Sequence, residues 1–433
     1  MDYDVLIVGA GPSGLAAGIR IKQKNPMLSV CILDKGAQIG AHLLSGAVLE
    51  LQSLKKLLPD DWTNAPLGTP VTKDAFYWLS KRHAIRLPTP KPMTNRGNHI
   101  ISLSLLCQYL AEKATLLGCD VYPGFAAVDA LFHEQGHVMG VISGDVGIDA
   151  HGTPGENFQA GIPIHAQQTL FAEGCRGQVS EKLIHHFQLR QGIQPQTYGL
   201  GIKEIWRIDP QNHQQGHVLH TIGWPLDTKT YGGSFVYHQN DHQIALGLVA
   251  GLDYKNPYFS PFEEMQRFKT HPKIARLLKN GERLAYGARA LNEGGWQSIP
   301  KLTFPGGALI GDAAGFLNVA KIKGIHHAIE SGILAADACV LALSTEKKSG
   351  DEIINYQEAF QTSWMEKELY KVRNIRPGFQ KGLVWGLINA AFETYVSKGH
   401  SPWTLPHKTD HTSLKYKHHL PILKQYCFLL PLE

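Results

Sequence analysis

The feature that most constrains this chain is a glycine-rich turn between a buried strand and a helix at its start. Residues 4–8 form a short β-branched run typical of a buried strand, and residues 15–24 have the composition of a helix. Gly9, Gly11 and Gly14 separate them in the spacing G-x-G-x-x-G, and a second strand at 29–33 ends at Asp34. This order of strand, turn, helix, strand and acid predicts a dinucleotide-binding unit of the α/β class.

Each of these residues has a mechanical role in such a unit. Gly9 permits the tight turn, Gly11 lets the backbone approach a pyrophosphate, and Gly14 lets the helix pack closely on the strand. The first N–H groups of the helix and its dipole favour the phosphates. Asp34, twenty residues beyond Gly14, is placed to accept hydrogen bonds from the ribose hydroxyls of the adenosine.

A second fingerprint near residue 310 favours FAD over NAD. The chain reads FPGGALIGDAAG over 304–315, which predicts a strand, a Gly-Asp turn and a following helix. FAD enzymes of the glutathione-reductase-like class carry such a segment far downstream, with its Asp on the ribityl chain and its helix pointing at the flavin. It adds the candidates Gly306, Gly307, Gly311 and Asp312. The middle of the chain has no second G-x-G-x-x-G motif, so we expect no separate NAD(P)H domain.

The middle of the chain changes character between the two fingerprints. Residues 99–118 look helical, and residues 120–122, 138–142 and 169–172 look like strands that return to the nucleotide-binding sheet. The turn EGCRG at 173–177 is similar to cofactor-contacting turns of flavoproteins, which makes Gly174 a candidate. From about 196 to 294 strands dominate and predict a largely antiparallel inserted domain over the flavin. That sheet is either a pocket for a ring-shaped substrate or a simple lid.

Composition excludes several classes of protein. With 433 residues, 43% hydrophobic and 18% charged, the chain is globular and long enough for two or three domains. No run of 18 apolar residues predicts a membrane span, and no signal peptide precedes the first strand. The six cysteines lack C-x-x-C spacing, and we expect adjacent histidine pairs such as His326-His327 to point apart. We therefore predict no metal ligands, and no nucleophile set marks a catalytic residue.

Longer strings resemble one family. They include GAHLLSGA (40–47), YGGSF (231–235), YGARALNEGGWQSIPK (286–301), NVAKIKG (318–324) and VRNIRP (372–377). On these strings, which lie within roughly residues 1–412, the chain resembles electron-transfer flavoprotein–ubiquinone oxidoreductase. The resemblance implies an FAD enzyme that takes electrons from reduced electron-transfer flavoprotein and passes them to ubiquinone, with quinone near Gly232 and Gly233. It implies no nucleic-acid partner.

The resemblance also implies a domain order and a location. We expect the first FAD-binding part at 1–195, an inserted quinone-binding α+β domain at 196–294, and the second FAD-binding part at 295–345. A helical, membrane-proximal segment follows at 346–412, and an atypical tail at 413–433. The family dips into one membrane leaflet, here through about 39–57 and 379–396. The protein would be peripheral or monotopic on the cytoplasmic face of a bacterial inner membrane, or on the matrix side of the mitochondrial inner membrane.

Residues 379–396 support the membrane expectation on their own. They are apolar, too short to span, and interrupted by Lys381 and Glu393. Their aromatic residues and the flanking Arg373, Arg376 and Lys398 suit a membrane interface, although a buried helix is the plain alternative.

The match ends at the tail. The family binds a [4Fe-4S] cluster through C-terminal cysteines, and those ligands are absent here, since only Cys427 stands in the tail. We interpret the tail as the product of a frameshift or an early stop, which puts full activity in question. Two alternatives stay open: a related FAD-dependent reductase of a lipophilic substrate, geranylgeranyl-reductase-like or FixC-like, and a non-catalytic FAD-binding remnant.

Overall fold

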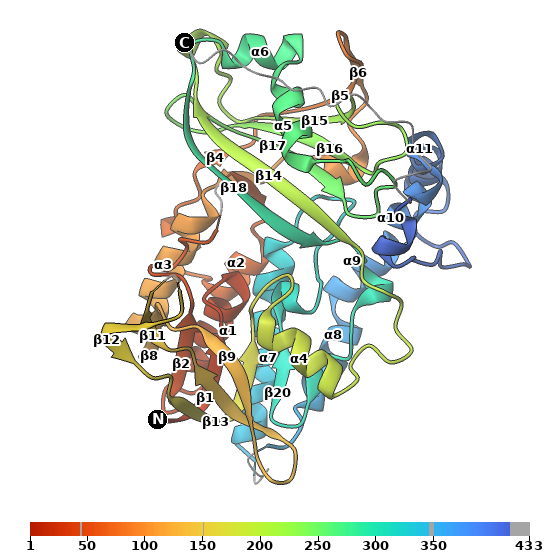
Figure 1. Cartoon of the computed structure of the whole chain (residues 1–433). Coiled ribbons are helices and arrows are strands. Elements are labelled where there is room, and N and C mark those ends of the chain that lie inside the picture. Colours follow the sequence, from red (N-terminus) through yellow and green to blue (C-terminus); the bar gives the residue numbers. More distant parts are fainter. Residues whose placement is uncertain (44–45, 150, 346–349, 416–433) are drawn as a thin grey trace.

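The described part of the chain is organised around two sheets stacked end to end (Figure 1). The computed structural model describes residues 1–43, 46–149, 151–345 and 350–415. The tail that the sequence analysis singled out lies, beyond residue 415, outside the described residues. We call the lower layer of Figure 1 the first sheet and the upper layer the second sheet.

The first sheet is the nucleotide-binding one. Within the described ranges it has eight strands, with the order β19-β20-β13-β1-β2-β8 and with β10 and β9 attached through β13. The path from β20 to β8 is parallel. The strands are β1 (Asp2–Val8), β2 (Val30–Asp34), β8 (Cys119–Pro123), β9 (Ala127–Phe132), β10 (Val138–Ser143), β13 (Pro163–Phe171), β19 (Thr303–Phe304) and β20 (Gly307–Leu309).

Helices pack on this sheet because its strands are apolar on both faces. The helices of this half are α1 (Pro12–Lys24), α2 (Gln52–Leu57), α3 (Leu103–Leu116), α4 (Gln178–His186) and α7 (Ile325–Leu343). By length and apolar composition α7 is the one helix of the described residues that could cross a membrane, but 67% of that stretch is buried. It packs along α1 in the largest hydrophobic core, so here it is a core helix.

The second sheet has seven strands in the described residues, in the order β18-β14-β17-β16-β15-β5-β6. They are β5 (Lys73–Leu79), β6 (Ala84–Leu87), β14 (Tyr198–Arg207), β15 (His217–Gly223), β16 (Gly232–His238), β17 (Gln243–Gly251) and β18 (Glu282–Asn292). All pairs are antiparallel except β15 with β5. The expected antiparallel insertion is therefore present.

One difference from expectation concerns where this sheet begins. Strands β5 and β6 fall within residues 1–195, which the sequence analysis assigned to the first FAD-binding part, yet they extend the second sheet. β6 pairs with β5, and β5 pairs with β15, which lies more than a hundred residues later in the chain. Such a pairing leaves no local pattern, since periodicity reports only which face of a strand is buried.

The two faces of the second sheet differ. One face is covered by α5 (Pro261–Lys269) and α6 (Pro272–Leu278), which bury Met265, Phe268 and Ile274 against it. The other face packs against a small sheet of β3 (Ala47–Leu49), β4 (Thr69–Pro70) and β7 (His99–Ile101), which belongs to the first half. We call this second face the inner face, because it looks toward the first sheet.

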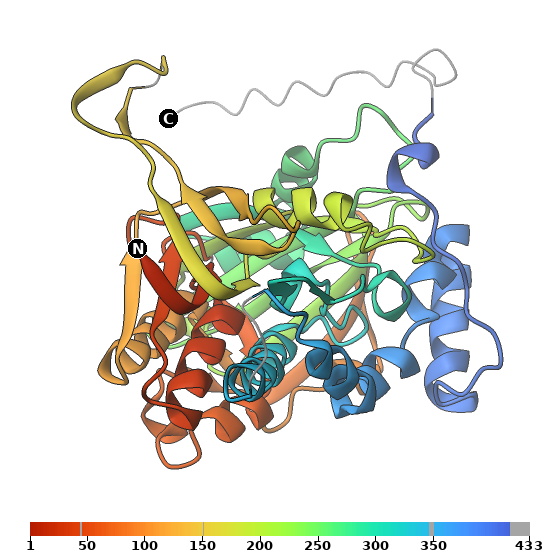
Figure 2. The ribbon, with the colours of Figure 1, turned by 90° about the horizontal axis from the view of Figure 1, so that it is seen from below.

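The remaining elements lie at the edges. A hairpin of β11 (Val146–Ile148) and β12 (Pro154–Gln159) projects from the first half, as Figure 2 shows. Helices α8 (Ile354–Thr362), α9 (Trp364–Lys371), α10 (Ile375–Gly378) and α11 (Leu383–Ala391) follow α7. A π-helical turn, Phe392–Val396, continues α11. Figure 1 places α10 and α11 beside one end of the second sheet.

Candidate functional site

The parallel strands of the first sheet bring four predicted site residues to one edge. Gly9 follows β1, Asp34 ends β2, Gly174 comes shortly after β13, and Gly311 comes shortly after β20. In open α/β sheets this carboxyl edge is where ligands bind. The four residues come from segments up to about three hundred positions apart and meet because β20, β13, β1 and β2 are neighbours.

The first glycine turn is built for close backbone contact. Gly9 has φ +108°, and a Cβ there would lie 2.5 Å from the carbonyl oxygen of Ala172. A Cβ at Gly14 would lie 2.0 Å from the carbonyl oxygen of Gly9, whereas one at Gly11 would meet nothing within 4 Å. Gly11 thus faces open space at the start of α1, which no side chain caps, so its first N–H groups remain for a ligand.

Asp34 is partly occupied by the turn itself. Its Oδ2 accepts a hydrogen bond from the N–H of Ala10 at 2.9 Å, and its Oδ1 accepts one from the N–H of Gly36 at 2.8 Å. A carboxylate oxygen has two lone pairs, so each retains capacity for a hydroxyl. The side chain therefore orders the glycine turn in addition to the ribose contact expected of it.

The second fingerprint touches the first directly. Gly311 has φ +61°, its N–H donates to Ser331 Oγ at 2.8 Å, and a Cβ on it would lie 2.3 Å from Ser13 Oγ. On α7, a Cβ at Gly332 would lie 2.2 Å from the carbonyl oxygen of Ser13. Gly311 of the second fingerprint and Gly332 of α7 are thus both packed onto Ser13 of α1. Like α1, α7 begins at a glycine without a side-chain cap.

Asp312 lies in the turn between β20 and α7. Burial raises the pKa of its carboxyl to about 6, against hydrogen bonding from Asn292 that lowers it. The Asn292 side-chain amide donates to the main-chain oxygen of Asp312. The turn is therefore tied to the end of β18, which connects the second fingerprint to the second sheet.

Two predicted cofactor residues do not lie at this edge. Gly306 and Gly307 stand at the opposite end of β20, in its turn from β19. A Cβ at Gly306 would lie 1.9 Å from the Val138 carbonyl oxygen, and one at Gly307 would lie 2.6 Å from that of Thr169. Close packing of strands accounts for both glycines at this end of β20, and their contact with a cofactor stays a prediction.

The inner face of the second sheet carries the predicted quinone residues. Gly233 pairs with Val249 and faces inward, and Phe235 and His220 occupy the next cross-strand row. Gly232 points to the other face, where a Cβ would meet Leu226, and its φ of +148° suits glycine. A Cβ at Gly233 would lie 2.6 Å from the carbonyl oxygen of Thr221 on the neighbouring strand. The two glycines therefore have different surroundings, and of the two only Gly233 is on the inner face.

Polar groups that the sequence did not mark lie on the same face. His220 Nε2 lies 2.9 Å from the Tyr237 hydroxyl, and burial lowers the pKa of His220 to about 3. Lys203 donates to the carbonyl oxygen of Gly46 at 2.8 Å, and burial lowers the pKa of its ammonium to about 8. The alternation of side chains along each strand is the sequence signal that could have found them. Only the register between the strands shows that these side chains share a face of the sheet.

The histidine pair at the start of α7 corrects one expectation. The rings of His326 and His327 lie 4.1 Å apart, and their Nε2 atoms lie 3.5 Å and 3.1 Å from Glu368 Oε1. Both side chains bend toward a carboxylate that α9 supplies, which adjacency in the sequence could not show. Asn318 donates to the same oxygen, and Lys321 Nζ lies 2.7 Å from Oε2. With an ammonium in contact, we interpret the cluster as a structural hub, not a metal site.

We expect Glu368→Gln to destabilise the protein by about 2–3 kcal/mol at pH 7, because it breaks a buried charged network. Burial alone would raise the pKa of Glu368, but hydrogen bonds from His326 and His327 and the nearby Lys321 lower it. Its stabilising effect is therefore present above the unfolded-state pKa of about 4.3 and is lost as the pH falls. Urea unfolding should show the variant and wild type converging toward acid pH. Glu358→Gln, on an exposed side chain, is the control.

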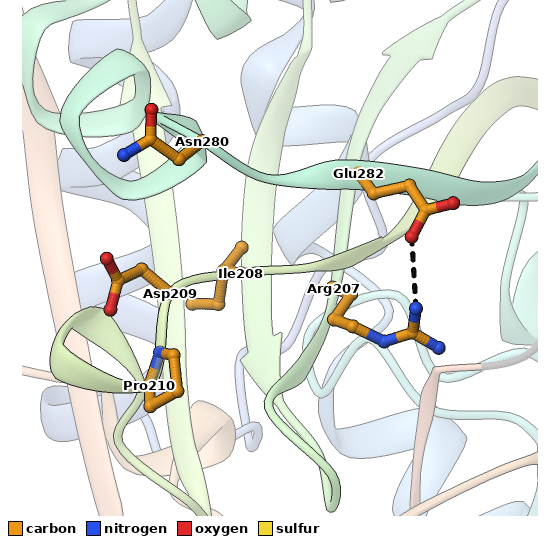
Figure 3. Close-up of a pocket in the computed structure, with 6 residues that line it drawn as sticks. All are labelled: Arg207, Ile208, Asp209, Pro210, Asn280 and Glu282. Carbon is orange, nitrogen blue, oxygen red and sulfur yellow. Dashed lines mark hydrogen bonds and ion pairs between the residues drawn. The ribbon is translucent and has the colours of Figure 1, made fainter.

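A separate hollow lies on the second sheet, away from this edge. It has a volume of about 340 Å³ and is lined by Arg207, Ile208, Asp209, Pro210, Asn280 and Glu282 (Figure 3). Arg207 Nη1 lies 3.0 Å from Glu282 Oε2 across it. These residues lie at or next to the end of β14 and the start of β18. Asn292 lies at the opposite end of β18, where it contacts Asp312 in the turn of the second fingerprint. The hollow therefore has no residue in common with the candidate site.

Comparison with known proteins shows the family of this chain. Residues 7–55 match the family model for an NAD(P)-binding Rossmann-like domain. Residues 198–291 match the model described as ETF-QO, ubiquinone-binding. Electron transfer flavoprotein-ubiquinone oxidoreductase of Homo sapiens is 50% identical over 431 residues, with 96% of this chain and 70% of that protein covered. This chain belongs to the electron transfer flavoprotein–ubiquinone oxidoreductase family.

Two further members of the family have a similar sequence identity to this chain. The Arabidopsis thaliana protein is 52% identical over 420 residues, which is 95% of this chain, and this chain spans 65% of its length. The Dictyostelium discoideum protein is 48% identical over 432 residues, and this chain spans 71% of its length. All three relatives are named as mitochondrial.

Solved structures show the same flavoprotein fold at low identity. A geranylgeranyl bacteriochlorophyll reductase-like protein of Thermoplasma acidophilum aligns with a TM-score of 0.63 at 18% identity, covering 95% of this chain and 89% of that one. A flavoprotein/dehydrogenase of Cytophaga hutchinsonii aligns with a TM-score of 0.61 at 17% identity, covering 92% and 89%. The chain is thus an FAD-binding α/β protein with an inserted sheet. At this identity the likeness to the geranylgeranyl reductase-like protein concerns the fold alone.

The residues present fit FAD but not an iron–sulfur cluster. A cradle for FAD is formed where α1 and α7 begin without side-chain caps and where Gly11 and Gly174 face open space. A Cβ at either glycine would occupy that space. By contrast, Cys31, Cys107, Cys119 and Cys339 are buried free thiols, and no three cysteines converge in the described residues. Cys427 lies outside those residues. We therefore derive no step through a [4Fe-4S] cluster.

Proposed function

We propose that this chain accepts electrons from reduced electron transfer flavoprotein on FAD and passes them to ubiquinone at a membrane surface. Bound FAD supplies a ring that can accept two electrons and release them one at a time. The residues that would hold it are Gly9, Gly11, Gly14, Asp34, Gly174, Gly311 and Asp312. The N-terminus of α7 would favour negative charge on the reduced ring. The quinone would lie on the inner face of the second sheet, beside Gly233.

The observation that carries this proposal is an exposed apolar face on α11 and its π-helical continuation. Its large side chains are Val384, Trp385, Ile388, Phe392, Tyr395 and Val396, between 38% and 68% exposed. Their spacing puts them on one side of the helix. Glu393, which interrupts the sequence pattern, is 2% exposed and accepts hydrogen bonds from Asn374 and Ser401 inside the protein. The outer face is therefore free of that acid, as an interfacial helix requires.

The helix that carries this face contacts the segment just before β16, where the predicted quinone residues lie. The N–H of Leu383, the first residue of α11, donates to the Thr228 carbonyl oxygen at 2.8 Å. Phe379 lies with its ring centroid 5.1 Å from that of Tyr231, the residue before Gly232. A lipophilic substrate held by a membrane at α11 would thus lie close to the start of β16 in the second sheet, which supports quinone as the acceptor.

Two details of the membrane expectation change. Arg373 and Arg376 are 3% and 4% exposed, so they cannot meet lipid headgroups, whereas Lys381 and Lys398 at the ends of the segment are exposed. The segment 39–57 was also expected to enter the leaflet. Its apolar residues Leu49, Leu54 and Leu57 lie fully buried in the first core, so we propose α11 with its continuation as the membrane contact.

The decisive experiment is donor-dependent quinone reduction. Protein reconstituted with FAD should reduce a short-chain ubiquinone when supplied with reduced electron transfer flavoprotein, and should not do so without that donor. A yellow, folded protein that is inert in this assay would contradict the proposal and support a non-catalytic FAD-binding remnant. Reduction of an isolated geranylgeranyl double bond instead would support the related lipophilic-substrate reductase.

We expect Trp385→Glu with Ile388→Glu to abolish binding to anionic lipid vesicles while leaving the bound flavin in place. Two carboxylates on the apolar face oppose insertion, and neither side chain contributes to the cores. Co-sedimentation with vesicles measures the effect. Leu341→Glu, on a side chain 51% exposed on α7, is the matched control and should bind as wild type does. Equal binding of all three proteins would reject α11 as the contact.

A further inference from the structure

Arg376 is buried between two acids at the junction of α10 and the second sheet. Its side chain is 4% exposed. Its Nε lies 2.9 Å from Glu293 Oε2, and Nη2 and Nη1 lie 3.0 Å and 3.2 Å from the two carboxylate oxygens of Asp253. Three donors of one planar group thus meet three carboxylate oxygens, which a lysine ammonium cannot reproduce.

The same guanidinium contacts Tyr231, the residue before β16 and its predicted quinone residues. Its central carbon lies 3.9 Å from the ring centroid of Tyr231, which also contacts Phe379. The main-chain oxygen of Tyr231 accepts a hydrogen bond from the N–H of Gly251 at 2.9 Å. Gly232 and Gly233 follow Tyr231 at once. Arg376 therefore fixes the ring of Tyr231, immediately before Gly232 at the start of β16.

The strands that meet here explain why the contact matters. Asp253 follows β17, Glu293 follows β18, and Tyr231 precedes β16. Arg376 belongs to α10, seven residues before α11 begins. One side chain thus connects three strand ends of the second sheet to the segment that carries the exposed apolar face. A Cβ at Gly251 would lie 2.9 Å from its Nη2, so the backbone leaves room for it.

We infer that Arg376 is a positioning residue for the acceptor: Glu293 and Asp253 fix its guanidinium, and the guanidinium fixes the ring of Tyr231. This contact holds the start of β16, Gly232 and Gly233, in the form that receives the quinone ring next to the membrane-facing helix. The inference rests on the proposed function. It assigns affinity for the acceptor, and not electron transfer itself, to this residue.

Arg376→Lys tests it, because the charge stays while the planar fork and the stacking are lost. We expect an approximately tenfold higher KM for short-chain ubiquinone with kcat changed less than twofold, and a matching weakening of equilibrium ubiquinone binding in dialysis. Tyr231→Leu should act in the same direction, and it leaves no buried charge unpaired if the arginine variant fails to fold. Arg207→Lys, in the exposed pair with Glu282, is the matched control.

The outcomes are separable. If wild-type protein neither binds nor reduces ubiquinone, the proposed function and this inference both fail. If wild type binds ubiquinone but Arg376→Lys and Tyr231→Leu bind it equally well, this inference alone is overturned. A parallel fall of kcat, flavin content and melting temperature, without a specific change in KM, would also overturn it, because that pattern describes a merely structural role.

Discussion

Gly14→Ala is expected to abolish FAD binding, although it adds a single methyl group. The added Cβ would lie 2.0 Å from the carbonyl oxygen of Gly9. That oxygen is a backbone atom, and the position of the Cβ is set by the backbone of α1, so no side-chain rotation relieves the contact. To relieve that contact α1 must move off β1, which removes its N-terminal N–H groups from the place where a pyrophosphate would lie. Reconstitution with FAD should leave the variant without the flavin absorbance near about 450 nm.

The control for this prediction is Gly155→Ala on the projecting hairpin. There a Cβ would lie 3.2 Å from the nearest atom, and that strand is exposed throughout. This variant should take up FAD as wild type does. Flavin uptake by Gly14→Ala with wild-type affinity would show that the first glycine turn does not bind the cofactor.

Gly332→Ala is expected to remove both flavin and stability. In the middle of a helix this change normally stabilises by about 1 kcal/mol, because glycine is a poor helix former. Here the Cβ would lie 2.2 Å from the Ser13 carbonyl oxygen, so the sign should reverse to a loss of about 1–3 kcal/mol from overpacking. Because Gly311 touches the same serine, forcing α7 from α1 separates the two halves of the FAD cradle.

Thermal unfolding of the flavin-free protein and the bound-flavin ratio measure these two effects. Leu341→Ala, on the exposed side of the same helix, should change neither by much. A higher melting temperature for Gly332→Ala would mean that the α1–α7 contact tolerates the methyl group, and the account of the joined fingerprints would be wrong.

The glycine turn and the family could be read from the sequence because their information is local or is carried by long strings. Residues 4–34 form β1, α1 and β2 as predicted, and Gly9 and Gly14 make the close backbone approaches expected of the glycine turn. The ribose contact of Asp34 stays a prediction, since its described partner on the turn is the N–H of Ala10. Gly311 was found from a turn of a few residues. Gly306 and Gly307 were predicted from the same stretch but lie at the other end of β20. Glycine serves both ligand approach and strand packing, and the sequence alone does not separate the two.

The tertiary structure decided which distant residues meet. It put β5 and β6 into the second sheet, joined Gly311 to Ser13, and gathered His326, His327 and Glu368. It also turned Arg376 inward, where the sequence had suggested a membrane-facing charge. Backbone geometry and capping act over one or two turns of chain, so a sequence pattern records them. The contact between Glu293 and Arg376, which are 83 residues apart, depends on how whole sheets and helices pack. Only the folded chain determines that packing.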